Sequence, residues 1–348
     1  MVTVLSVNPA RPTSQPPLPI ELIWKIIDLL VPSEGSLVPR DHALTRTLLN
    51  LALACRITHY KAHELLLTCC MHLNSQTALR RFNIATEGCL LDCGAHHRTH
   101  GREMYLAPFT HRNQVTEASA GEIDVTFSML AGSLRRLVLD FPWRGFYPEG
   151  GDGQPTIILG RAFRRLRAIE EFVSVSDDLP LDVPQEEPDY QYVAWSTWPQ
   201  LRRLSLSSPY IDAKSVEALL RCPHLTHLVI AKPRGWDDPL PDDLAQRVSW
   251  DRLGLRRMTV LRNARRPARR FDWRSRNDTP GFGQSFLGRL ITTLADRVSE
   301  RTPQPEIRYV DVPPVPYDPT DRVEVWIREH ALDGTIWDSH GRLYEPVA

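Results

Sequence analysis

A short apolar pattern that recurs along the second half of the chain restricts its fold most strongly. The motif L-x-x-L-x-L, or a degenerate form of it, starts at six positions: Leu134, Ile169, Leu201, Leu225, Leu255 and Ile307. We assign the sixth copy to Ile307, Val310 and Val312. Alternating apolar residues predict a strand with one buried face, and recurrence every ~20–50 residues is typical of repeats that stack side by side. One unit cannot bury its apolar face alone, so we expect a single array.

Segments with the apolar spacing of helices lie between these strands, at 213–222 and 285–298. Strand and helix in alternation predict an α/β fold, an irregular solenoid with insertions because the intervals between copies are unequal. We place this repeat domain at 126–320. A proline-rich connector leads to 321–348, where Val325, Trp326, Ile327 and Trp337 predict a short C-terminal cap that covers the last repeat.

The N-terminal part of the chain has a different pattern. Residues 1–16 are rich in proline and predict a disordered arm, whereas 17–85 predict a small helical module and 86–125 a linker without sustained periodicity. In the first helix Leu22, Ile26, Leu29 and Leu30 form one apolar stripe and Ile23 and Ile27 a second. A second helical run should break near Thr58. A unit of this size cannot bury so much apolar surface internally, so it needs a partner.

Two motifs in this module resemble those of fungal F-box proteins. The first, LP-x-E-L-x-x-x-I, starts at Leu18, and the second, L-x-L-A-x-x-C-R, starts at Leu49 after a long spacer at 31–47. Together with the repeats, they make the chain similar to an F-box protein with degenerate leucine-rich repeats. The residues that the resemblance assigns to adaptor binding are Leu18, Pro19, Glu21, Leu22, Ile26, Leu29, Leu30, Leu49, Leu51 and Cys55.

The resemblance implies a function without catalysis. The helices would bind a Skp-type adaptor, which joins a cullin scaffold in an SCF-type ubiquitin ligase, and the repeat domain would bind a target protein that the sequence does not identify. An alternative is a protein-binding scaffold that uses the F-box fold outside a ligase, because the spacer is long and the usual aromatic after Cys-Arg is displaced to Tyr60.

A basic stretch follows the fifth repeat strand and offers a second binding surface. Ten arginines lie between 252 and 276, interleaved with Phe271 and Trp273. Such a stretch is either a solvated loop or a site for an acidic partner, because the arginine fork matches carboxylate and phosphate groups. The chain as a whole has 42 basic and 42 acidic residues, which argues against nucleic acid. The candidate residues are Arg256, Arg257, Arg262, Arg265, Arg266, Arg269 and Arg270.

The sequence predicts no enzyme and no cofactor. It contains no G-x-S-x-G elbow and no phosphate-binding G-x-x-x-x-G-K-[ST] loop. Cys89, Cys93, His96, His97 and His100 are zinc-ligand types, but their spacing does not match a finger or a ribbon, and we expect buried cysteines and exposed histidines instead. With few cysteines, no apolar run of membrane-spanning length and no basic start to the chain, we expect a cytoplasmic or nuclear location.

Overall fold

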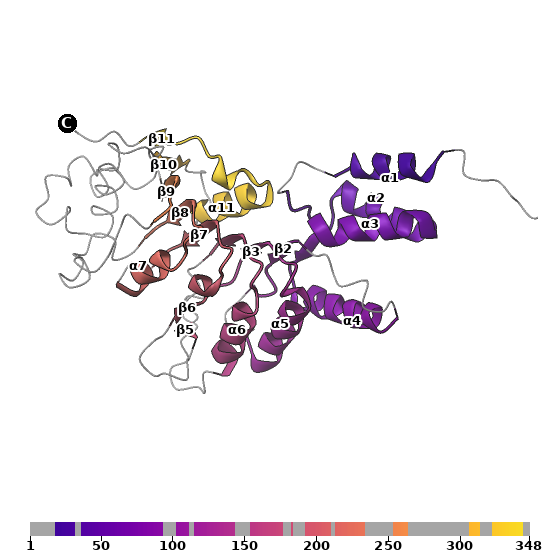
Figure 1. The fold of residues 1–348 in the computed structure, drawn as a ribbon, viewed down its shortest axis with the longest axis horizontal. Helices are drawn as coiled ribbons and strands as arrows, with labels where there is room; N and C mark the ends of the chain where they lie inside the picture. The colour runs from indigo at the N-terminus through magenta and orange to yellow at the C-terminus, as the bar shows by residue number, and fades with distance from the viewer. Residues whose placement is uncertain are drawn as a thin grey trace, which may run out of the picture.

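The fold is built on a sheet whose strand order follows the chain (Figure 1). The computed structural model describes residues 18–31, 36–92, 102–110, 115–142, 154–176, 182–183, 192–209, 213–233, 253–263, 306–313 and 322–343. Within this part the nine-stranded sheet has the order β1-β2-β3-β4-β7-β8-β9-β10-β11, and its strands are Met71–Leu73, Glu103–Leu106, Arg136–Leu139, Glu171–Ser174, Arg203–Ser207, His227–Ala231, Arg257–Asn263, Glu306–Val312 and Arg342–Leu343. All neighbours are parallel except β10 and β11. The molecule is therefore a mixed α/β protein.

The predicted strands are present, and their apolar positions lie in register. Leu137 pairs with Phe172, Phe172 with Leu204, and the same row continues through Leu228 and Met258 to Ile307. The sixth copy of the motif is assigned wrongly, because Ile307 pairs with the middle apolar residue of its neighbour and not with the first. Strand β10 carries apolar residues on both faces, so its sequence alone does not set the register.

The sheet also begins earlier in the chain than the repeat pattern indicates. Strand β1 lies within the segment predicted as the helical module, and β2 lies within 86–125, the segment predicted as a linker. Both are short and have Met, His or Tyr at some positions, so the leucine pattern does not find them.

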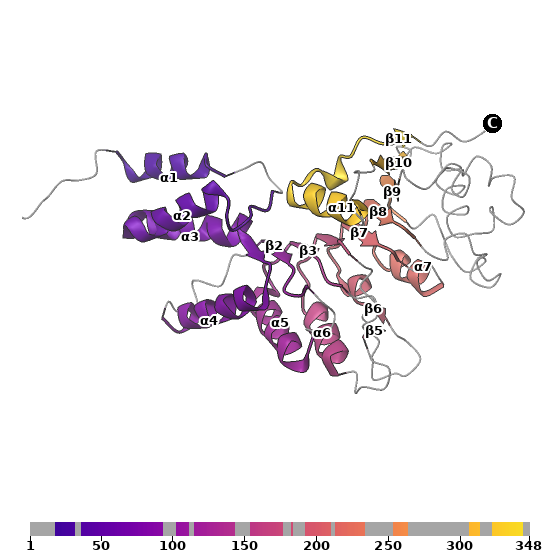
Figure 2. The ribbon, with the colours of Figure 1, turned by 180° about the vertical axis from the view of Figure 1, so that it is seen from behind.

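Helices cover one face of the sheet and the C-terminal segment covers the other (Figures 1 and 2). The first group is α4 (Gln76–Asp92), α5 (Glu117–Leu130), α6 (Gln154–Arg164) and α7 (Ala213–Leu220). The opposite face carries α11 (Arg322–Leu332) and the 3₁₀ helix η8 (Thr335–Trp337). The C-terminal segment contacts the last repeat strand, because β11 pairs with β10, and its helix α11 extends across the sheet face as far as β3. Val323 and Ile327 share a buried cluster with Val138 of β3, because the alternate positions of the strands are apolar too.

Smaller elements complete the described chain. Strands β5 (Asp182–Val183) and β6 (Tyr192–Val193) form a separate antiparallel pair, followed by the 3₁₀ helix η3 (Ala194–Thr197).

At the N-terminal end lie α1 (Ile20–Asp28), α2 (Ala43–Ala54) and α3 (Arg56–Cys69). The helical run breaks at Cys55 and not near Thr58, because Cys55 adopts an extended conformation. The predicted arm at 1–16 and the predicted helix at 285–298 lie outside the described residues.

Candidate protein-interaction site

The helices α1, α2 and α3 form a group with a core of its own, which we call the helical module (residues 18–70). Both α1 and α2 pack against α3. The buried core residues are Ile27, Val38, Leu44, Leu48, Ala62 and Leu65. Of the two stripes on α1, the stripe of Ile23 and Ile27 faces this core, and the stripe that contains Leu22 and Ile26 is exposed.

Large apolar side chains are concentrated on the outside of the helical module. Leu29 is 78% exposed and Leu53 is 85% exposed. We call the full set the apolar face: Leu18, Leu22, Trp24, Ile26, Leu29, Leu30, Leu49, Leu53 and Tyr60. Elsewhere in the described residues, the large apolar side chains with comparable exposure are only Ile84, Val125 and Leu343. Exposed large apolar side chains gathered on one small module mark an interaction site, because their exposure to water costs free energy that a partner would recover.

Polar contacts fix α1 against α3 and so hold the apolar face outward. The indole Nε1 of Trp24 donates to the carbonyl oxygen of Ile57 at 3.1 Å. The Nζ of Lys61 lies 2.8 Å from Oδ1 of Asp28. The hydrogen bond to Asp28 raises the pKa of Lys61 above its ordinary value, so this lysine is charged at neutral pH.

The corner between α2 and α3 is fixed by Thr58. Its Oγ1 donates to the carbonyl oxygen of Leu51 at 2.6 Å and lies 3.4 Å from Sγ of Cys55. The contact between the side chains of Thr58 and Cys55 lowers the pKa of the exposed Cys55 thiol. The contacts of Thr58 therefore fix the orientation of the end of α2 relative to the start of α3.

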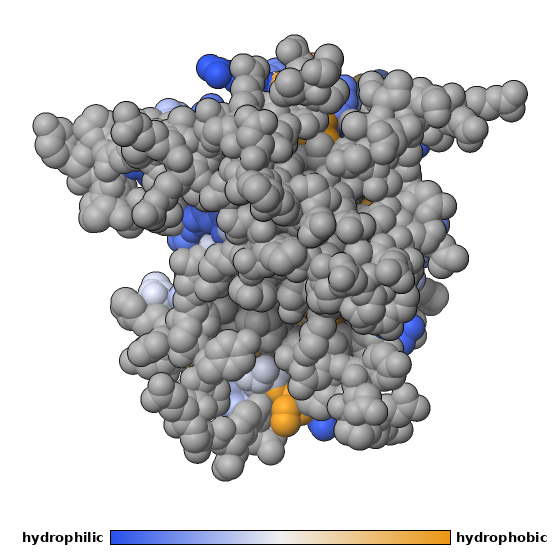
Figure 3. Space-filling model, turned by 90° about the vertical axis from the view of Figure 1, so that its left-hand side faces the viewer, coloured by the Kyte–Doolittle hydropathy of each residue, from blue (hydrophilic) through white to orange (hydrophobic). Residues whose placement is uncertain are grey.

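The structure places the ten predicted adaptor-binding residues on this one module. Nine are exposed, and Leu51 is half-buried against the module's core. The prediction missed Trp24, which lies on the same helix but in neither stripe and whose exposure the periodicity alone does not reveal. At the opposite end of the sheet, the described residues that reach the surface are mostly hydrophilic, with small apolar areas (Figure 3).

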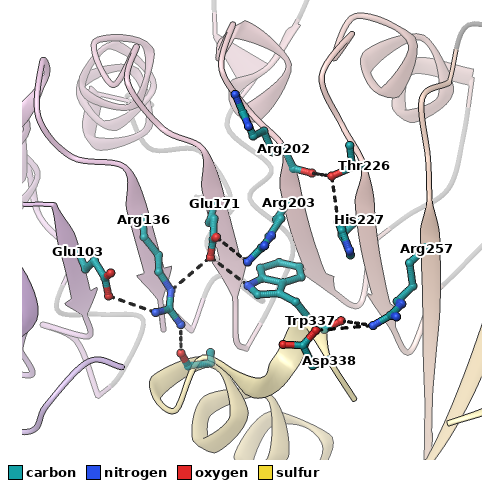
Figure 4. Close-up of polar contacts among 11 residues, drawn as sticks. Glu103, Arg136, Glu171, Arg202, Arg203, Thr226, His227, Arg257, Trp337 and Asp338 are labelled. Atoms are coloured by element: carbon teal, nitrogen blue, oxygen red, sulfur yellow. Dashed lines mark hydrogen bonds and ion pairs between the residues drawn. The ribbon is translucent and has the colours of Figure 1, made fainter. Parts of the chain in front are cut away.

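A row of charged side chains crosses the face of the sheet that α11 covers (Figure 4). Its members occupy the first position of successive strands and pair in register: Glu103, Arg136, Glu171, Arg203, His227, Arg257 and Glu306. Arg136 is almost fully buried; its Nη1 lies 3.2 Å from Glu103 and its Nε 3.6 Å from Glu171. Arg203 lies 2.8 Å from the other oxygen of Glu171.

The same row binds the C-terminal segment. Arg136 donates to the carbonyl oxygen of Ala331, and Trp337 Nε1 donates to Glu171 at 3.0 Å. Further along, Arg257 donates to the carbonyl oxygen of Trp337 at 2.8 Å. The chain thus occupies this face with its own helix, and the covered area is not free for a partner.

The structure describes some of the arginines that the sequence predicts to bind an acidic partner. Arg257 is the first residue of β9, Arg256 directly precedes the strand, and Arg262 lies within it. Arg265, Arg266, Arg269 and Arg270 fall outside the described residues. The sheet brings Arg202 and Arg203, at the amino-terminal end of β7, to the same end of the strands as Arg256 and Arg257. The prediction missed this arrangement. A signal was available, because an Arg-Arg pair stands directly before the apolar strand residues in both repeats.

The described residues contain no group of three or more side chains that could hold a metal ion. Cys89 lies in α4, whereas Cys93, His96, His97 and His100 fall outside the described part, so the zinc question is not tested. Among the helices that the structure describes, none combines the length and the apolar character needed to cross a membrane.

The comparisons with known proteins assign no family. A scan against protein-family models finds no match, and a search of the curated proteins finds no relative.

Proposed function

We propose that this chain is the substrate receptor of an SCF-type ubiquitin ligase, with the helical module as an F-box and the sheet as a degenerate leucine-rich-repeat domain. The observation that carries the proposal is the apolar face. The leucines and the isoleucine of the F-box-like motifs are exposed on the module, except Leu51, which is half-buried. A fold that positions these side chains outward gains stability only when a partner covers them.

The order of the strands supports the second half of the proposal. Parallel strands that follow the chain, with helices on one face, are the arrangement expected of stacked strand–helix repeats. The adaptor would bury Leu22, Ile26 and Leu29 of α1, and the repeat domain would hold the target. Catalysis would come from proximity, since a target held close to a charged ubiquitin-conjugating enzyme reacts at a raised effective concentration.

The first test replaces exposed leucine and isoleucine by charge. We expect Leu22→Asp/Ile26→Asp to weaken capture of a purified fungal Skp-type adaptor about tenfold or more, because the carboxylates would be buried without partners. Both side chains are about half exposed, 46% and 51%, so the variant should fold. The matched control is Ile84→Asp/Val125→Asp, which makes the same change on exposed positions of α4 and α5.

The two variants should have the same far-ultraviolet circular dichroism, and only the first should lose the adaptor. Equal capture by both variants, or no capture by the wild type, would refute adaptor binding through the apolar face. Adding the cullin separates the two protein-binding hypotheses. The cullin should co-precipitate with the adaptor on a ligase receptor, but not on a scaffold that works outside a ligase.

A further inference from the structure

Two repeats bring arginines together at the amino-terminal ends of β7, β8 and β9. We call Arg202, Arg203, His227, Arg256 and Arg257 the basic edge (Figure 4 labels all except Arg256). The backbone joins its outer members directly: Thr226 N donates to Arg202 O at 2.8 Å, and Arg256 N donates to Thr226 O at 2.8 Å. Residues far apart in the sequence thus lie together at one end of the strands, with the side chain of Arg202 directed away from Arg203 and His227 (Figure 4).

The charges of the basic edge are only partly neutralised. Arg203 pairs with Glu171 at 2.8 Å, and Arg257 pairs with Glu306 at 3.1 Å. Arg202 and Arg256 are exposed, and neither has an ion pair with the residues that the structure describes. Burial lowers the pKa of His227, and the positive charges of Arg203 and Arg257 lower it further.

We propose that the basic edge binds an acidic segment of a protein through aspartate and glutamate carboxylates. This inference rests on the proposed function and names the class of target. One sheet face carries helices and the other carries α11, so the strand ends remain as a surface with unpaired charge. The exposed carboxylate of Asp338 already lies 3.8 Å from Arg257, which indicates that a carboxylate fits beside this edge.

The spacing of the free arginines fits an extended peptide. Arg202 and Arg256 stand two strands apart, which is about 10 Å. In a polyproline II segment, which has three residues per turn and a rise of about 3.1 Å per residue, residues three positions apart lie on the same side and about 9 Å apart. Carboxylates at positions i and i+3 of the target would therefore meet the two arginines, one each.

Neighbouring groups disfavour a nucleic acid at this edge. Glu171, Glu306 and Asp338 stand among the arginines and would repel a continuous phosphate backbone. A peptide with separate carboxylates can avoid these acids.

The test uses fluorescence anisotropy with the full chain and a labelled twelve-residue peptide that carries glutamate at every third position. We expect Arg202→Gln/Arg256→Gln to weaken binding about fivefold, since two exposed ion pairs are lost. The control Arg161→Gln/Arg164→Gln removes the same charge from exposed positions on α6 and should bind like the wild type. The peptide with glutamine in place of glutamate should not bind.

Three results would overturn the inference: equal loss in both variants, binding of the glutamine peptide, or no binding to the wild type. Two further probes test other anions. A phosphoserine peptide that binds where the glutamate peptide does not would assign the edge to phosphate. A single-stranded oligonucleotide that binds more tightly through the same arginines would assign it to nucleic acid.

The two proposals fail separately in this design. Adaptor capture is measured on the same variants, and Arg202→Gln/Arg256→Gln should retain it. Leu22→Asp/Ile26→Asp should retain the acidic peptide. Loss of peptide binding with adaptor capture intact would contradict only the target class.

Discussion

At the scale of single residues, Arg136 connects the sheet to the C-terminal helix. Its buried guanidinium contacts Glu103, Glu171 and the carbonyl oxygen of Ala331. We expect Arg136→Met to lower the free energy of unfolding by about 3 kcal/mol, because two largely buried carboxylates lose their shared cation. Urea unfolding followed by tryptophan fluorescence measures the loss.

The preceding residue supplies the control. Arg135 pairs with Glu170, but its side chain is 59% exposed. Exposed pairs contribute little, so Arg135→Met should cost less than about 1 kcal/mol. If the two methionine variants are equally destabilised, burial does not make the contacts of Arg136 more stabilising than the exposed pair of Arg135.

At the scale of elements, the sequence predicts what repeats and misses what depends on tertiary contacts. The leucine pattern locates β3, β4, β7, β8 and β9, because each strand carries its own apolar residues. The periodicity of 322–332 predicts a helix but not the face of the sheet that it covers. In α1 both stripes are apolar, so only packing decides that Ile27 is buried and Ile26 exposed.

The position of α11 leads to a prediction about a distant amide. The N–H of Leu37, in the spacer between α1 and α2, donates to the carbonyl oxygen of Leu332 at 2.7 Å. Glu329 is exposed in the second half of α11, and Glu329→Pro should break this helix at a cost of about 3 kcal/mol. We expect hydrogen exchange at the Leu37 amide to become faster, as measured by nuclear magnetic resonance.

The adjacent amide shows whether the effect is local. Val38 N donates to the carbonyl oxygen of Cys69 within the helical module, and its protection should remain in Glu329→Pro. Glu329→Ala keeps the helix and should leave both amides protected. Faster exchange at both amides in the proline variant would mean that the whole module had opened.

At the scale of the whole molecule, the helical module is attached at two places. The chain continues from α3 directly into β1, and the spacer docks on α11 through Leu37, which is 3% exposed in the cluster around Val323 and Ile327. The module has few buried residues of its own, so it should be marginal without these contacts. The two attachments thus make the module and the sheet unfold together and give the apolar face a fixed direction relative to the basic edge.

This coupling predicts the number of thermal transitions. The wild type should unfold in one calorimetric transition, because the module gains stability from the sheet. We expect Leu37→Ala, which opens a cavity worth about 2–5 kcal/mol at the junction, to separate an early transition of the module from a later one of the sheet. Leu343→Ala makes the same change at an exposed position on β11 and should keep one transition. Two transitions in the wild type would mean that the two parts are not coupled and that the apolar face and the basic edge are free to reorient. One transition in Leu37→Ala would mean that the coupling does not depend on Leu37.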